Sequence, residues 1–303
     1  MNQTQSHFHH KKIAVFGAGW LGNAIVQNAL ELGMQVTTLT RNPERSRELA
    51  TLGVQTTITA PLHETDWHDQ IPQDQDYIVN CVSSAGNGLE GYRTSYLDGN
   101  TSLLNWVGST SHPAKFIYTS STSVYSQSDG STVNEDSPTP EPSQAGEILL
   151  EAENLLRTKS PFSQTHILRL AGLYGPNRHY LLNLLRKGTT ELPGRGDLLL
   201  NLLHLEDATS AIFASLQSNH PNFHLYNVTD GNPSTKSDIV HWLAKQLQIP
   251  TPTFNPNITP TRSPIRQSGG KIPNRIISNQ KIQKELTWSP KYPSFEDGYQ
   301  DLL

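Results

Sequence analysis

The sequence contains a single cysteine, Cys81, among 303 residues, which excludes a disulfide within the chain. So little cysteine is typical of proteins kept in a reducing compartment, and we expect a cytoplasmic location. No apolar run approaches the ~18 residues that a membrane span needs, and the polar start lacks the apolar core of a secretory signal. Cys81 ends an apolar strand-like run, which favours a buried packing residue over a nucleophile.

A large excess of charge of one sign is also missing. The formal net charge is −4, so nothing indicates bulk attraction to nucleic acid or to an anionic membrane. We expect a small-molecule substrate, no nucleic-acid or membrane partner, and a monomer or homodimer. The polar start includes His7, His9 and His10, which could bind metal adventitiously. We interpret residues 1–11 as a disordered tail and predict no metal site.

Three glycines follow the first strand-like run in the pattern G-x-G-x-x-G. Gly17 permits a tight turn out of the strand, Gly19 lets a pyrophosphate approach the backbone, and Gly22 lets the next helix pack closely on the strand. The free N–H groups and the dipole at the start of that helix, Trp20 to about Leu32, favour a phosphate. A glycine-rich turn without a ligand is the alternative. The position between a strand and a helix favours dinucleotide binding.

Strand-like and helix-like segments alternate along the chain, which indicates βαβ units and a parallel sheet. We predict an α/β fold with a Rossmann-type, doubly wound parallel sheet and a smaller C-terminal substrate-binding region. The dinucleotide-binding domain should cover residues 12–170. Residues 171–303 should form mainly the substrate-binding region, with segments that return to the first domain. The site should lie at the carboxyl ends of the strands, between the two parts.

The end of the second expected strand, residues 35–40, indicates which dinucleotide is preferred. NAD enzymes usually place a carboxylate about 20 residues after the glycines, where it binds the ribose 2′-OH. Thr40 occupies this position and Arg41 follows it. No carboxylate is present to repel a 2′-phosphate, and an arginine is present to bind one, so we expect NADP in preference to NAD. A solvated Arg41 in the first turn of the next helix is the alternative.

Later motifs resemble those of the extended short-chain dehydrogenase/reductase superfamily, in its nucleotide-sugar epimerase and dehydratase group. They are YTSSTSVY at 118–125, RLAGLYGP at 169–176, LHLEDA at 203–208 and YNVTDG at 226–231. The similarity covers residues 12–303, and the segment from 269 to 295 resembles an atypical, YeeZ-like branch. The resemblance implies an NAD(P)-binding oxidoreductase, epimerase or dehydratase. The cofactor-binding positions expected from the glycine pattern and the resemblance together are Gly17, Gly19, Trp20, Leu21, Gly22, Thr40, Arg41, Val82, Ser83, Ser84, Thr119, Ser120, Leu170 and Ala171.

One departure from the family pattern concerns the proton relay. Family enzymes carry a Tyr-x-x-x-Lys pair on the helix after the fifth strand, where Lys lowers the pKa of Tyr so that Tyr can relay a proton. Counting back from Leu150-Glu151-Ala152-Glu153, these two positions hold Ala145 and Leu149. Neither side chain titrates, so the usual acid/base is missing. Ser121 keeps the family's catalytic Ser/Thr position and could bind a substrate oxygen, although a capping hydroxyl is the alternative.

Few residues could replace this relay. Tyr125 lies one turn beyond Ser121, and His204 could titrate near neutral pH, although a structural histidine before a helix is the alternative. The candidate catalytic residues are therefore Ser121, Tyr125 and His204. We expect an oxidoreductase of the epimerase/dehydratase type that acts on a carbonyl or hydroxyl of a small polar substrate. The alternatives are a non-catalytic NADP-binding redox sensor or regulatory protein, and a structural subunit that keeps only the fold.

Overall fold

The computed structural model describes residues 3–84, 86, 88–108, 112–258 and 271–303. The chain divides into two compact units. Unit 1 comprises Met1–Ser121, Ala145–Arg169 and Thr209–Tyr226, and unit 2 comprises Thr122–Gln144, Leu170–Ala208 and Asn227–Leu303. Residues 122–144 therefore group with unit 2, and residues 209–226 group with unit 1. The substrate-binding role that we expect for residues 171–303 stays a prediction.

A seven-stranded sheet, in the order β12-β7-β5-β4-β1-β2-β3, forms the centre of the fold. Its strands are β1 (Lys12–Phe16), β2 (Gln35–Thr40), β3 (Thr56–Thr59), β4 (Tyr77–Asn80), β5 (His112–Ser121), β7 (Phe162–Leu170) and β12 (Asn222–Val228). The ladders β1–β2, β2–β3, β1–β4 and β4–β5 are all parallel. The chain runs outward from β1 to β3 and then returns to β4 beside β1, which confirms the predicted doubly wound sheet.

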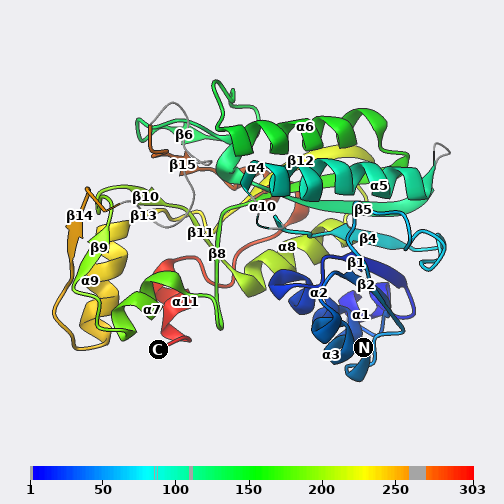
Figure 1. Ribbon diagram of the computed structural model, residues 1–303, viewed down its shortest axis with the longest axis horizontal. Helices are drawn as coiled ribbons and strands as arrows, with labels where there is room; N and C mark the ends of the chain where they lie inside the picture. Colours follow the sequence, from blue (N-terminus) through cyan, green and yellow to red (C-terminus); the bar gives the residue numbers. More distant parts are fainter. Residues whose placement is uncertain (1–2, 85, 87, 109–111, 259–270) are drawn as a thin grey trace. The chain divides into compact units, whose positions relative to one another are not determined.

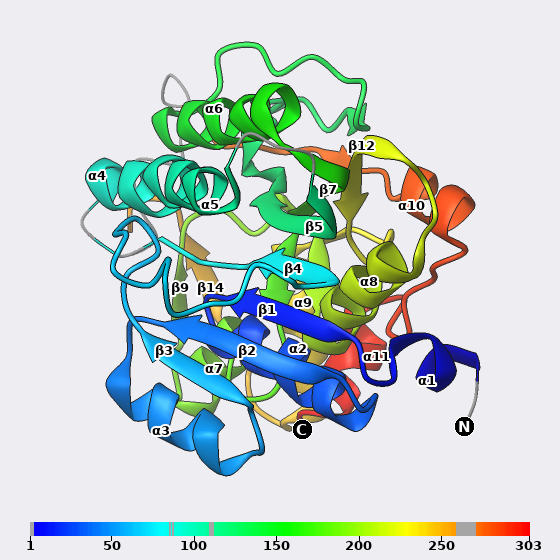
Figure 2. The ribbon, with the colours of Figure 1, turned by 90° about the vertical axis from the view of Figure 1, so that its right-hand side faces the viewer.

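Helices cover both faces of this sheet. In both ribbon views α2 (Trp20–Glu31) and α3 (Pro43–Thr51) lie over one face, and α5 (Gly99–Val107) and α6 (Gln144–Lys159) lie over the other (Figures 1 and 2). The core beneath α5 and α6 is aromatic: the ring of the fully buried Trp67 lies 5.1 Å from that of Phe16 and 5.4 Å from that of Trp106. Such tilted aromatic pairs add to the free energy of apolar burial.

The helical segment that follows β4 (Tyr77–Asn80) is divided into three parts in the structure. It consists of α4 (Gly88–Tyr92), the π-helical turn η1 (Arg93–Asp98) and α5. The amide of Gly99 donates a hydrogen bond to the carbonyl of Thr94, five residues earlier. The apolar pattern predicts a helix here, but it does not distinguish an i→i+5 bond from an i→i+4 bond.

The N-terminal segment differs from the expected disordered tail. Residues Gln3–Phe8 form helix α1, and residues 1–2 lie outside the described part of the chain. The Phe8 side chain is fully buried, with ring centroids 5.5 Å from those of Tyr77 and Phe213. A polar sequence predicts disorder, whereas burial of this single aromatic side chain against residues distant in sequence fixes the segment.

Unit 2 consists of short strand pairs and helices. The strand pairs are β6 (Thr132–Val133) with β15 (Ile276–Ile277), β8 (Gly172–Tyr174) with β11 (Leu202–His204), β9 (Glu191–Pro193) with β14 (Thr253–Asn255), and β10 (Leu199–Leu200) with β13 (Ser234–Thr235). Its helices are the 3₁₀ turn η2 (Thr122–Val124), α7 (Tyr180–Arg186), α9 (Lys236–Gln246), α10 (Gln280–Leu286) and α11 (Phe295–Gln300), while α8 (Leu205–Gln217) passes into unit 1. Leu182, Leu192 and Leu243 form part of its apolar core. No helix in the described part of either unit is long and apolar enough to cross a membrane.

Candidate functional site

The glycine turn between β1 and α2 depends on two residues that have no room for a side chain. Gly17 has a φ of +94°, and a Cβ there would lie 2.6 Å from the backbone nitrogen of Val82. A Cβ on Gly22 would lie 2.3 Å from the Gly17 carbonyl oxygen. These distances give Gly17 and Gly22 the turn and packing roles that the sequence pattern predicts.

Gly19 occupies the opposite kind of position. It is exposed at the N-cap of α2, and a Cβ there would come no closer than 4.0 Å to the Gly17 carbonyl oxygen. No side chain caps the helix. The start of α2 therefore has no capping side chain and follows directly on the exposed Gly19. A helix start that no side chain caps, beside a residue without a side chain, is a position where proteins bind phosphate groups.

The loop that follows β4, Cys81–Ser84, lies directly against this turn. The Cys81 thiol donates weak hydrogen bonds to the carbonyls of Phe16 and Gly17, at 3.4 and 3.3 Å. Burial raises the pKa of Cys81 to about 12, so the thiol stays protonated at neutral pH. These observations agree with a packing residue beneath the turn.

At the end of β2, the structure places Thr40 inside and Arg41 outside. Thr40 is buried, and its hydroxyl accepts a hydrogen bond from the Asn42 amide at 3.3 Å. Asn42 caps α3 by accepting hydrogen bonds from the amides of Glu44 and Arg45. Arg41 is exposed at the carboxyl edge of the sheet, on the same strand end as Thr40. The sequence places no carboxylate between positions 40 and 43.

Helix α6 presents apolar side chains at the two positions where the sequence analysis expects the family relay. Ala145 and Leu149 are 0% and 1% exposed, and Glu153 follows one turn later on the same buried face. Glu153 accepts a hydrogen bond from Ser120 Oγ at 2.6 Å and pairs with Arg169, whose Nη2 lies 2.6 Å from Oε2 and whose Nε lies 3.0 Å from Oε1. The sequence reasoning missed this network, although both charged residues stand in recognisable motifs.

The other predicted residues near β5 have different surroundings. Thr119 is buried and its hydroxyl donates to the Asn80 carbonyl at 3.4 Å. Ser121 ends β5 and is half-buried. Leu170 and Ala171, in unit 2, are buried, and the Ala171 amide donates to a backbone carbonyl at 3.0 Å. Thr119 and Ser120 are buried, and Ser121 is the partly exposed residue of the three.

The two titratable candidates belong to unit 2 and are both buried. The Tyr125 hydroxyl donates to the Asn134 carbonyl at 2.8 Å and lies 3.0 Å from Asn227 Oδ1. His204 is 2% exposed, and its ring lies 4.1 Å from that of Tyr292. Its Nδ1 accepts a hydrogen bond from the Glu206 amide at 3.4 Å. Burial lowers the pKa of His204, so the imidazole stays neutral at neutral pH.

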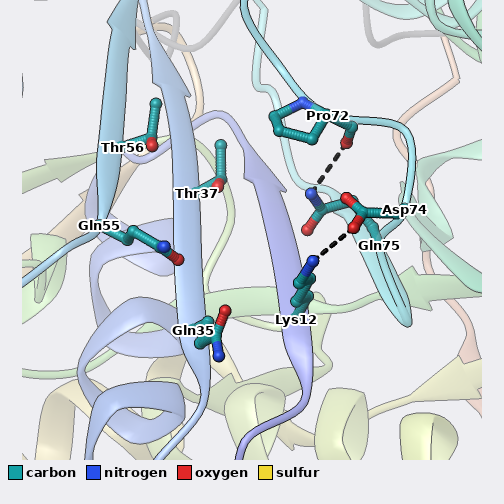
Figure 3. A pocket seen from close by; sticks show the side chains of 8 residues that line it. All are labelled: Lys12, Gln35, Thr37, Gln55, Thr56, Pro72, Asp74 and Gln75. Atoms are coloured by element: carbon teal, nitrogen blue, oxygen red, sulfur yellow. Dashed lines mark hydrogen bonds and ion pairs between the residues drawn. The ribbon is translucent and has the colours of Figure 1, made fainter.

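A polar pocket lies at the other end of the sheet (Figure 3). It is lined by Lys12, Gln35, Thr37, Gln55, Thr56, Pro72, Asp74 and Gln75. Lys12 and Gln35 begin β1 and β2, whereas the glycine turn and Arg41 follow the ends of these strands. The pocket therefore includes no predicted cofactor residue. In the described ranges, no group of three or more His, Cys, Asp or Glu side chains is placed to hold a metal ion.

Several known proteins are similar to this chain. Protein YeeZ of Escherichia coli (strain K12) is 29% identical over 298 residues, which cover 93% of this chain and 97% of that protein. The structure of dTDP-glucose 4,6-dehydratase from Bacillus anthracis str. Ames, in complex with NAD, has a TM-score of 0.79 at 20% identity and covers 96% of this chain and 94% of that one. UDP-glucuronic acid 4-epimerase from Bacillus cereus, in complex with UDP-glucuronic acid and NAD, has a TM-score of 0.78 at 22% identity, with 95% and 96% covered.

A family model extends over most of the chain and includes the glycine turn. The model of the NAD dependent epimerase/dehydratase family matches residues 13–229. This range runs from β1 through the late strand β12, so it covers the whole of the central sheet except its first residue. It also agrees with the resemblance of the motifs at 118–125 and 169–176 to the extended short-chain group. The chain therefore belongs to the NAD dependent epimerase/dehydratase family.

Proposed function

We propose that the chain binds a nicotinamide dinucleotide at the glycine turn and acts as an oxidoreductase of the epimerase/dehydratase type on a small polar substrate. The observation that carries the proposal is the contrast among the three glycines. Gly17 and Gly22 are closed off by backbone atoms, whereas Gly19 faces open space beside uncapped helix amides. A turn needed only for packing has no reason to keep that one position open.

The dinucleotide fits the residues at this edge. The N-terminus of α2 would bind the pyrophosphate, and Thr40 and Arg41 would lie at the adenosine ribose. Further contacts are proposed from Trp20, Leu21, Val82, Ser83, Ser84, Thr119, Ser120, Leu170 and Ala171. When bound, the nicotinamide would supply a hydride acceptor or donor. The exposed Arg41 and the lack of a carboxylate at positions 40–43 support NADP over NAD.

Calorimetric titration with NADPH and NADH tests the binding site. Gly19→Val should abolish binding of both, because its side chain would fill the open space beside the start of α2. Unchanged binding in a folded Gly19→Val variant would contradict the proposed site.

The preference for NADP has a matched test on two exposed arginines. Arg41→Ala should weaken NADPH binding by about 10- to 100-fold, the value of a charge-assisted hydrogen bond, and leave NADH binding unchanged. Arg47→Ala removes the same charge from the exposed side of α3 and should change neither. NADH that binds the unaltered protein as tightly as NADPH would disprove the preference.

Ser121 is the residue that we propose to polarise the reacting oxygen, because it is the partly exposed hydroxyl at the end of β5. The proton would come from a substrate hydroxyl or from water, since Tyr125 and His204 are buried in hydrogen-bonded and aromatic surroundings. Ser121→Ala should lower turnover by about 10²- to 10³-fold and leave NADPH affinity unchanged. A panel of sugars, aldehydes and ketones, assayed with NADPH at several pH values, provides the measurement.

One observation favours a second function. The positions of the family's proton relay hold Ala145 and Leu149, both buried and both without a titratable group. A dinucleotide-binding sensor needs the glycine turn but not the relay. Absence of turnover across the panel, together with a protein partner that binds only the NADP-loaded form, would favour the sensor. Turnover that depends on Ser121 would exclude it.

A further inference from the structure

Two backbone amides of the loop Cys81–Ser84 are held by side chains. Asn80 Oδ1 accepts a hydrogen bond from the Val82 amide at 3.1 Å, and the hydroxyl of Tyr96 accepts one from the Ser84 amide at 3.1 Å. Ser83, between them, is exposed. The loop is therefore fixed on both sides of one exposed residue.

The two anchors are joined to each other through a buried amide. Asn80 Nδ2 donates to Asn100 Oδ1 at 2.8 Å, and Asn100 Nδ2 donates to the Tyr96 carbonyl at 2.7 Å. Asn80 and Asn100 are 1% and 0% exposed. Side-chain amides this deeply buried are costly unless their hydrogen bonds are made, so the chain of bonds has one low-energy arrangement.

The π-helical turn η1 contributes the outer anchor. Tyr96 lies within Arg93–Asp98, between α4 and α5, and is half-buried. Asn100 lies in the first turn of α5, directly after it. Single π-helical turns inside helices occur frequently at functional sites. Here the turn places a hydroxyl on the loop and an amide on the end of β4.

This network fixes the position of Val82, whose backbone lies directly against the glycine turn. The backbone nitrogen of Val82 lies so close to Gly17 that a Cβ there would be 2.6 Å from it. Any shift of the loop would therefore alter the space beside the turn. The amides of Val82 and Ser84 already have protein acceptors, which leaves the exposed Ser83 as the part of the loop presented to a ligand.

We propose that Asn80, Tyr96 and Asn100 are positioning residues that hold the loop Cys81–Ser84 in the form that receives the dinucleotide. The inference rests on the proposed dinucleotide site. None of the three need touch the ligand. They act by ordering the loop in advance, which lowers the conformational entropy lost on binding. Ser83 then contacts the dinucleotide from a fixed backbone.

The first test compares two tyrosines, Tyr96 in η1 and Tyr77 at the start of β4. Tyr96→Phe removes the acceptor of the Ser84 amide. Tyr77→Phe removes a hydroxyl that bonds His7 Nε2 at the opposite end of β4, and serves as the control. In Tyr96→Phe we expect faster hydrogen exchange of the Ser84 amide and NADPH affinity weaker by on the order of five- to tenfold. Tyr77→Phe should change neither.

A second pair of variants tests Asn80, which holds the Val82 amide. Asn80→Ser and Asn80→Ala both remove the bond to Asn100, but serine keeps a side-chain acceptor for the amide two residues later. NADPH should bind Asn80→Ser more tightly than Asn80→Ala, whatever stability the two variants lose in common. Equal affinity of these variants, or an unchanged Ser84 amide and NADPH affinity in Tyr96→Phe, would overturn the positioning role. An unaltered protein that binds neither NADPH nor NADH would instead overturn the dinucleotide site, and the positioning role with it.

Discussion

Two regions at the carboxyl edge of the same sheet are built on different principles. Beside β1 and β4, the site depends on backbone shape and on neutral hydrogen bonds: Gly17, Gly22 and the Asn80–Asn100 pair. Beside β5 and α6, it contains a buried ion pair between Glu153 and Arg169. In the first region a Cβ on Gly19 would come no closer than 4.0 Å to another residue, whereas the second region is filled by side chains that bind each other.

The difference separates ligand binding from chemistry. A pyrophosphate needs room and amides, which glycines provide wherever the turn is kept. A proton relay needs titratable side chains at particular positions, and Ala145 and Leu149 cannot provide them. One turn further along α6, the carboxylate of Glu153 is occupied by Ser120 and Arg169.

The largest effect is expected in the ionic region. Glu153→Ala leaves the Arg169 guanidinium buried without its partner and should lower the free energy of unfolding by about 3–5 kcal/mol. Glu151→Ala is the control: it lies on the same helix and breaks the exposed pair with Arg93, whose side chains are 50% and 51% exposed. Glu151→Ala should lower the free energy of unfolding by less than about 1 kcal/mol. Urea unfolding measures both.

A double variant sharpens this prediction. Glu153→Leu combined with Arg169→Met replaces the ion pair by apolar side chains and should recover most of the stability lost by Glu153→Ala. If Glu153→Ala were no more destabilising than Glu151→Ala, the buried pair would not carry the stability that its geometry indicates.

At the glycine turn, the free energy of unfolding should depend on the volume of an added side chain rather than on its charge. Gly22→Ala forces a Cβ to within 2.3 Å of the Gly17 carbonyl oxygen, and backbone must shift. We expect a loss of about 3 kcal/mol, the upper range for overpacking, together with loss of NADPH binding. Gly19→Ala adds the same methyl group where the nearest atom lies 4.0 Å away and should be much less destabilising. Comparable destabilisation by both would remove the distinction between the closed and open glycines.

We expect the free energy of unfolding to depend on pH through His166, a second buried ionisable side chain on β7. His166 is 1% exposed, lies three residues before Arg169 on the opposite face of the strand, and contacts the ring of His224 at 5.2 Å. Burial first, and then the charges of His224, Lys115 and His220, lower its pKa to about 4, although a hydrogen bond involving His220 opposes this.

Because the folded pKa of His166 is lower than the unfolded value of 6.5, its contribution to stability is full above pH 6.5 and is lost as the pH falls toward 4. We expect a loss on the order of 2 kcal/mol over this window. His166→Phe should flatten this part of the curve of unfolding free energy against pH. An equally steep curve in the variant would assign the acid sensitivity to other groups.

The smallest effect concerns two neighbouring serines. Ser120→Ala removes a hydrogen bond to Glu153 but keeps the ion pair, so we expect a loss of about 1 kcal/mol in stability. Ser121→Ala should act mainly on turnover, which we expect to fall by about 10²- to 10³-fold. Chemical denaturation and the activity panel together separate the two. If Ser120→Ala lowered turnover and Ser121→Ala lowered stability, the roles that we assign to the two serines would be reversed.

The parts of the site that were predictable are local in sequence. A G-x-G-x-x-G pattern after a strand predicts the turn because all its atoms lie within six residues, and alternation predicts the sheet order near β1. Asn80, Tyr96 and Asn100 were not predicted, since their bonds depend on the register of β4 against a helix with a π turn. The burial of Phe8 likewise depends on contacts with Tyr77 and Phe213, which no local pattern contains.

The π turn Arg93–Asp98 also bears on how this chain would tolerate a change of length. A turn closed by an i→i+5 bond holds one residue more than a turn closed by an i→i+4 bond, and each residue of an α-helix turns the chain by about 100°. Deleting one residue here would restore α-helical geometry and rotate the faces of α5 by that angle relative to α4. Asn100 would then point away from Asn80. A relative one residue shorter at this point would need a different anchor for the loop, whatever its residues there.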